Sequence, residues 1–198
     1  MTHSAFIRSE LRSVLGRLEM VKLTRYTPCE STLSGYALCA SEEWLLVWQF
    51  NEFWPDGFTL VRIDGIEKVR CGVYEWHWTE MLRDEGIATQ LPEPNIAIGP
   101  LPSLLSQLRG RETPVILQCE EPNEDIEDFY IGKIIQLDNS GCTFANFDGM
   151  GIWDNELHKI GFDEITRIQF DTPYATHFSR HLNRDCPFDA NGNWLPVT

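Results

Sequence analysis

The chain has 198 residues, of which 42% are hydrophobic, and its formal net charge is −14. This length fits one ordinary domain or two small ones. The charge disfavours nucleic-acid binding, because affinity for a phosphate backbone comes from Lys and Arg. It is compatible with solubility alone or with a basic partner.

No apolar run reaches the roughly 18 residues that span a bilayer, and the first residues carry no signal-peptide pattern. The sequence therefore predicts a cytoplasmic protein with no membrane contact. The six cysteines form no C-x-x-C pair and are predicted to be free thiols: Cys29, Cys39, Cys71, Cys119, Cys142 and Cys186.

Apolar residues spaced by three and four predict an amphipathic helix over residues 4–19. Alternating and continuous apolar runs then predict five strands, at residues 20–24, 35–40, 44–50, 58–63 and 66–71. A turn cluster over residues 51–57 contains Pro55, Asp56 and Gly57. A closing helix is predicted over residues 76–83.

The second half follows the same plan. A short helix is predicted from residue 103 to residue 108, and strands at residues 114–119, 129–137, 142–147, 156–162 and 165–170, before a terminal segment at 173–182. Residues 120–127 are rich in Glu and Asp, and they predict a solvated acidic loop. Residues 185–198 predict an irregular tail, anchored by Phe188 or Trp194.

Two segments of the first half recur in the second. The run Ile63–Val69 returns as Phe162–Ile168, and Tyr74-x-x-His77-Trp78-x-x-x-Leu82 returns as Tyr174-x-x-His177-Phe178-x-x-x-Leu182. Self-similarity of this kind predicts two copies of one small unit. The predicted units are residues 1–88 and 103–198, and the proline-rich residues 89–102 form a stiff linker between them.

A helix followed by five short strands and tight turns predicts a mainly β fold. We expect two tandem small five-stranded, strongly bent barrels, each preceded by a short helix. This order resembles the Sm-like fold of bacterial and eukaryotic RNA-ring proteins, in the leading helix and in the bends Ile63–Ile66 and Phe162–Ile165. The chain is also similar to small bacterial proteins with a Trp-Leu-Leu…Phe…Asp-Gly…Arg-Ile-Asp-Gly-Ile run, a resemblance that implies no activity.

The Sm-like resemblance implies RNA binding through the barrels. Sm-like RNA binders carry an Asp and an Asn after the third strand, and a basic turn between the fourth and fifth strands. Here those turns read Asp64-Gly65 and Asp163-Glu164. Nucleic-acid binding therefore stays an alternative, and it predicts a local basic patch drawn from Lys22, Arg25, Lys68, Arg70 and Lys133.

The motifs of common enzymes are missing from the sequence. There is no Gly-x-Ser-x-Gly elbow, no phosphate-binding Gly-x-x-x-x-Gly-Lys loop and no dinucleotide-binding Gly-x-Gly-x-x-Gly run. Cys71 precedes His77 by six residues, but this spacing fixes no geometry between a thiol and a base. The sequence predicts no catalytic residue and no cofactor, and an enzyme with an unfamiliar site between the two units is a further alternative.

Histidines are the other candidates for chemistry. His177 and His181 would share a helix face near Cys186, but Met81 stands in the first copy where His181 stands in the second, so no duplicated metal site is predicted. His77 and His177 occupy matched positions. Either they are ligands or acid–base groups, or they pack at the same corner of each unit.

Aromatic residues in turns are candidates for surface contacts. Phe53 and Trp54 fall in a predicted turn, and Trp153 falls in the equivalent region of the second copy. They either form a contact surface or pack over the end of a barrel. Our main hypothesis is a non-enzymatic binding or adaptor protein that acts through protein–protein contact. Its acidic surface would suit a basic partner, and the chain would then be an inhibitor or immunity-type factor.

Overall fold

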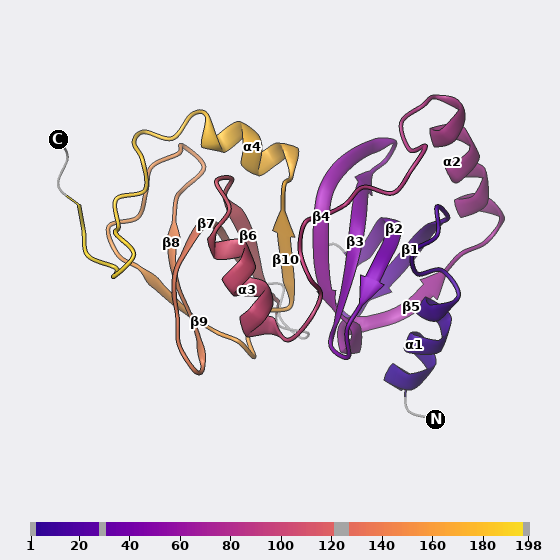
Figure 1. Cartoon of the computed structure of the whole chain (residues 1–198), viewed down its shortest axis with the longest axis horizontal. Coiled ribbons are helices and arrows are strands. Elements are labelled where there is room, and N and C mark those ends of the chain that lie inside the picture. The colour runs from indigo at the N-terminus through magenta and orange to yellow at the C-terminus, as the bar shows by residue number, and fades with distance from the viewer. Residues whose placement is uncertain (1–2, 28–30, 121–126, 196–198) are drawn as a thin grey trace.

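The computed structural model describes residues 3–27, 31–120 and 127–195. In this part of the chain, four helices accompany a single antiparallel sheet of ten strands (Figure 1). The first half contains α1 (His3–Arg12), β1 (Met20–Arg25), β2 (Thr32–Ala40), β3 (Trp44–Asn51), β4 (Trp54–Arg62), the short 3-10 turn η1 (Ile63–Gly65), β5 (Ile66–Arg70) and α2 (Val73–Asp84). The second half contains α3 (Leu101–Arg109), β6 (Val115–Glu120), β7 (Glu127–Leu137), β8 (Gly141–Asn146), β9 (His158–Gly161), β10 (Arg167–Phe170) and α4 (Pro173–Ser179).

The order of the strands repeats from one half to the other. The sheet runs β5-β1-β2-β3-β4-β10-β6-β7-β8-β9, so each half places its fifth strand first and its fourth strand last. The register repeats as well: Arg70 of β5 lies opposite Lys22 of β1, and Gln169 of β10 lies opposite Ile116 of β6. Residues that match in sequence therefore occupy matching places in the sheet.

The prediction of two separate barrels is not confirmed, because one open sheet runs through both halves. The outer edge of β4 pairs with β10 instead of returning to β5, so the first half does not close on itself. Strands β5 and β9 form the two ends of the sheet. The predicted unit boundaries at residues 88 and 103 remain predictions.

Apolar side chains fill both faces of the sheet, which explains the continuous apolar run of β3. Leu45 and Val47 point into a core that also holds Ile7 and Leu11 of α1. Trp44 and Leu46 point to the other face, because successive strand residues alternate between faces. Both faces of β3 are thus buried.

Helix α3 covers the junction between the halves. Its buried residues repeat with the spacing of one helix face, at Leu101, Leu104, Leu105 and Leu108. The core beneath them includes residues from both halves, among them Leu60 of β4 and Ile168 of β10. In Figure 1, α3 lies in front of β6 and β10. A shared core makes the two halves one packing unit.

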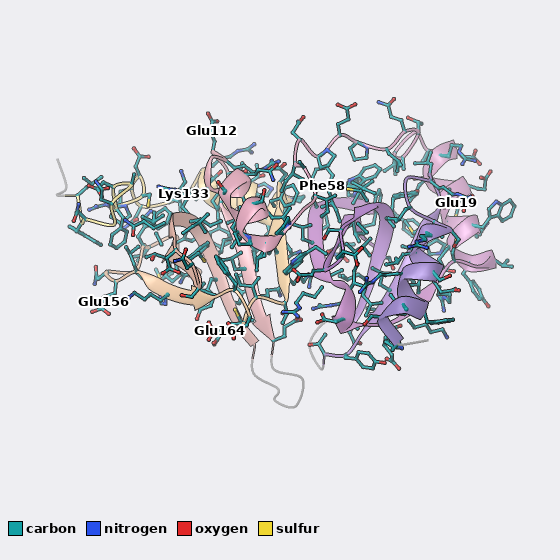
Figure 2. All side chains as sticks on the ribbon, turned by 60° about the horizontal axis from the view of Figure 1, so that its bottom comes forward. Glu19, Phe58, Glu112, Lys133, Glu156 and Glu164 are labelled. Atoms are coloured by element: carbon teal, nitrogen blue, oxygen red, sulfur yellow. The ribbon has the colours of Figure 1, made fainter. Side chains whose placement is uncertain are left out.

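The junction, where β4 pairs with β10, requires a close backbone approach. Phe58 stacks on Phe170 with ring centroids 5.2 Å apart, and Figure 2 labels Phe58 at the boundary between the halves. The preceding residue, Gly57, has φ 82°, and a Cβ there would lie 2.7 Å from the carbonyl oxygen of Asp171. Only glycine fits this position without strain.

A buried ion pair also joins the halves. The guanidinium of Arg25, at the end of β1, contacts both carboxylate oxygens of Glu120, at the end of β6. The two side chains are 5% and 4% exposed, and Thr166 donates a further hydrogen bond to Glu120 at 2.7 Å. The prediction that Glu120 begins a solvated loop is therefore wrong. Residues 121–126 of that acidic loop lie outside the described residues.

The other predicted elements are confirmed with shifted ends. Helix α1 ends at Arg12 rather than at residue 19, and β4 begins at Trp54 inside the predicted turn cluster, where the pairing with β3 shifts register. The tail is anchored as expected, since Phe188 packs on the second half and pairs with Trp194 at 5.1 Å between ring centroids. No helix in the described residues has the length and apolar character needed to cross a membrane.

We predict that Glu120→Ala lowers the free energy of unfolding by about 3–5 kcal/mol, because it leaves the Arg25 charge buried and unpaired. Urea unfolding followed by tryptophan fluorescence measures the change. The matched control is Asp64→Ala, which breaks the exposed pair of Asp64 with Arg62 and should cost at most about 1 kcal/mol. Equal losses for the two variants would contradict the role of the buried pair.

Candidate functional site

The exposed face of helix α2 is the clearest candidate for a contact site. The helix buries Glu75, Thr79 and Leu82, and this fixes the opposite face towards solvent. Val73 lies on that opposite face, while Tyr74 and Trp76, two positions apart, lie on its two flanks. Val73, Tyr74 and Trp76 are 78%, 73% and 61% exposed, respectively. We call these three residues the α2 patch.

The start of α2 explains why the α2 patch is exposed. The side chain of Glu75 turns back to accept a hydrogen bond from the backbone N–H of Gly72 at 3.0 Å, which caps the helix three residues before the predicted start. The other oxygen of Glu75 accepts a hydrogen bond from Nε of Arg70 at 2.8 Å. Because Glu75 is held inwards, its neighbours Val73, Tyr74 and Trp76 on the same helix turn point towards solvent.

The two aromatic residues predicted in the turn before β4 have different environments. Phe53 is half-buried and packs against Trp78 of α2, with ring centroids 4.9 Å apart. Trp54 is 71% exposed. The contact between Phe53 and Trp78 places the turn that carries Trp54 next to α2.

Trp153 does not belong to a surface site. It is 4% exposed, packs edge-on against Phe147 at 5.2 Å, and donates a hydrogen bond from Nε1 to the carbonyl oxygen of Arg184. The surface-contact interpretation fails for this residue, because its ring fills the core under α4. The packing alternative applies instead.

The two matched histidines are both exposed. His77 lies on the solvent side of α2, on the same face as Val73, while His177 lies on α4. The two histidines lie on different helices and do not form a cluster. No group of three His, Cys, Asp or Glu side chains that could hold a metal gathers among the described residues, His177, His181 and Cys186 included.

Three of the predicted basic residues gather beside the α2 patch. Lys22 of β1 lies opposite Arg70 of β5, and Lys68 is two residues before Arg70 on the same face of the strand. The guanidinium of Arg70 lies 5.9 Å from the centre of the Tyr74 ring. Arg25 is removed from this group by its buried pair with Glu120. A local basic surface therefore exists in an acidic chain.

A cavity of about 430 Å³ opens at the junction, beside the pair of Arg25 and Glu120. It brings together the two turns that match in sequence, since Asp64 from one and Asp163 and Glu164 from the other line it. Further carboxylates of the second half lie away from this cavity, among them Glu112 and Glu156, which are labelled in Figure 2. No His or Cys lines this cavity among the described residues.

The described thiols are not activated. Burial raises the pKa of Cys119 and of Cys142 to about 12. Burial also raises the pKa of Cys71, and the nearby carboxylates of Glu19 and Glu75 raise it further. A cysteine nucleophile needs a lowered pKa. All described cysteines are free, and Cys29 lies outside the described residues.

The sequence identified Trp54 and His77 as candidates but did not identify the three residues of the α2 patch as a contact surface. The signal was present in Gly72 followed by Glu75, a helix-capping pattern that moves the helix start forward and places Val73, Tyr74 and Trp76 in the first turn. No protein-family model, no curated protein and no solved structure matches this chain.

We predict that alkylation of Cys71 by iodoacetamide still accelerates as the pH rises past 9, since its pKa lies above the ordinary value of 9.0. The thiolate is the reactive form, so a raised pKa shifts the reaction to higher pH. Mass spectrometry of the folded protein measures the alkylation rate at each cysteine, and buried Cys142 should react more slowly than Cys71. A plateau for Cys71 below pH 8 would indicate an activated thiol and contradict this expectation.

Proposed function

We propose that this chain is a non-enzymatic binding protein, built from two tandem Sm-like units, that acts through protein–protein contact. Support for the units comes from the repeated order of a helix and five strands and from the repeated register. The single observation that carries the function is the exposure of Val73, Tyr74 and Trp76 together on one helix. Exposed aromatic residues in one patch mark contact surfaces in soluble proteins.

The chemistry around the α2 patch selects the partner. Arg70, with Lys22 and Lys68 on the same strand face, lies at the Tyr74 ring, and complementary charge speeds and orients protein association. The partner proposed for this surface presents an acidic segment that carries an apolar side chain. The basic partner expected from the net charge is a separate proposal, which the acidic rim formed by Asp163 and Glu164 supports.

We predict that Trp76→Ala weakens partner binding about 30-fold, the size of effect that truncating a central tryptophan has at protein interfaces. Lys68→Glu should weaken binding too, through the association rate and more strongly at low salt. The immobilised protein captures its partner from a lysate of the cells that produce it, and surface plasmon resonance measures the affinity of the recovered partner.

The matched control is Met150→Ala, which removes a side chain that is 78% exposed but lies in the second half. It should leave binding unchanged. The proposal is contradicted if Trp76→Ala binds as tightly as the native protein, if Met150→Ala has an equal effect, or if the contacting segment of the partner is basic.

Nucleic-acid binding is the second candidate, and the same basic group favours it. A basic strand pair beside an exposed Tyr ring is the combination that single-strand binding proteins use. The number of cations limits the affinity, because Lys22, Lys68 and Arg70 neutralise about three phosphates, and Arg70 already pairs with Glu75.

For this candidate we predict that single-stranded RNA is retained on a filter at low salt, with log K falling against log salt at a slope of about −2. Lys68→Glu should abolish retention, while Lys133→Glu, in the second half, should not. Absence of retention at low salt rejects nucleic-acid binding. If nuclease treatment releases the captured protein partner, a nucleic acid joins the two proteins, and nucleic-acid binding is favoured over direct protein contact.

A further inference from the structure

A second cavity at the junction has no role in the proposed contact surface. It measures about 350 Å³, within the range of small-molecule sites. Its walls come from both halves: Gln49, Asn51 and Asp56 from the first, and Ile116, Phe129, Gln169, Thr172 and Tyr174 from the second. We call it the amide cavity.

The first half contains a smaller cavity at the matching end of its fifth strand. By the sequence match, Arg70 corresponds to Gln169, Tyr74 to Tyr174, and Glu75 to Ala175. In the first half, Arg70 and Glu75 join in an ion pair and the cavity beside them measures about 180 Å³. In the second half both charges are replaced, by an amide and a methyl group. The exchange removes the ion pair and leaves the larger cavity.

The amide of Gln169 is the central observation. Gln169 is 8% exposed and lines the cavity, and no hydrogen bond joins its side chain to another residue in the part of the chain that the structure describes. The side chain is largely buried, but its amide atoms are accessible from the cavity rather than enclosed, so they can bond a ligand there. The group offers one acceptor and two donor hydrogens to the cavity.

The two other buried polar side chains of the lining, Gln49 and Thr172, are already engaged, while Asn51 and Tyr174 are exposed, which makes Gln169 the main buried recognition group. The carbonyl oxygen of Gln49 accepts hydrogen bonds from Thr59 at 2.6 Å and from Arg167 at 3.0 Å. Its amide nitrogen donates to Asp56 at 3.2 Å. The Thr172 hydroxyl accepts the backbone N–H of Ala175 at the start of α4.

The lining also selects the charge and shape of the ligand. Its single charged group is Asp56, so an anion is repelled, and the hydrogen bond from Gln49 already engages the carboxylate that would attract a cation. Phe129 and Tyr174 stand at the cavity with 43% and 50% exposure and ring centroids 6.5 Å apart. Aromatic rings of this kind contact the face of a planar group.

We propose that the amide cavity binds a small, uncharged, planar amide, such as a heterocyclic lactam or an aromatic carboxamide. The amide of Gln169 pairs with the donor–acceptor edge of the ligand, and Tyr174 and Phe129 contact its ring. The site is separate from the α2 patch and does not depend on it.

The experiment uses the full chain labelled with ¹⁵N, with uracil as the lactam and nicotinamide as the carboxamide. The side-chain amide signal of Gln169, identified by its loss in Gln169→Leu, should shift in a saturable manner with at least one of the two. Benzoate, a planar anion similar in shape to nicotinamide, should not shift it. A response to only one amide identifies the class of ligand. No shift with either amide at millimolar concentration, or an equal shift with benzoate, overturns the proposal.

Variants separate binding from folding. Gln169→Leu should weaken amide binding by at least about tenfold, measured by titration calorimetry, while the melting temperature stays the same or rises because no hydrogen bond is lost. Tyr174→Ala should weaken binding, and the matched Tyr74→Ala should not. A lower melting temperature for Gln169→Leu, or equal effects of the two tyrosine variants, overturns the proposal.

Discussion

The pairing of β4 with β10 is the constraint on which the rest of the structure depends. It is antiparallel, from Val61 opposite Arg167 to Phe58 opposite Phe170, and it turns what would be two sheet edges into the middle of one sheet. Helix α3 then covers a core that draws on both halves. Since β4 is occupied in this way, closing the first half through β5 would require breaking the junction and exposing that core.

The junction gives equivalent residues different environments. Lys68 and Arg167 match in sequence and in strand register, yet Lys68 is exposed on an end strand while Arg167 is 1% exposed in the middle of the sheet. A buried guanidinium needs hydrogen bonds, and Gln49 of the first half supplies one. The replacement of Arg70 by Gln169 fits the same rule, because an amide costs less to bury than a charge. The differences between the halves at these positions thus follow from where each fifth strand lies.

Most of the local structure could be predicted from sequence, and most of the long-range structure could not. The runs that form β3 and α3 carry their periodicity in neighbouring residues, so their place in the chain was clear. The pairing of β4 with β10 joins residues about a hundred positions apart, and the sequence of neither strand indicates which strand it pairs with. Glu120 belongs to an acidic segment, which predicts a solvent-exposed loop. Its burial depends on the ion pair with Arg25, a residue that only the folded chain brings close to it. Trp153 was uncertain for the same reason, since exposure in a turn depends on what folds over it.

The two fifth strands have different surroundings, because β5 lies at an end of the sheet and β10 lies in its middle. Strand β5 forms an open end that carries Lys68 and Arg70, charges that discourage pairing with another sheet edge. No strand lies beyond β5 in the described part of the chain, and α2 keeps the face opposite Glu75, Thr79 and Leu82 in solvent. Its counterpart α4 lies against strands that continue into the other half, so Tyr174 faces a cavity walled by both halves. The repeated Tyr position is 73% exposed in the first half and 50% exposed in the second, where a strand of the other half lies beyond the fifth strand.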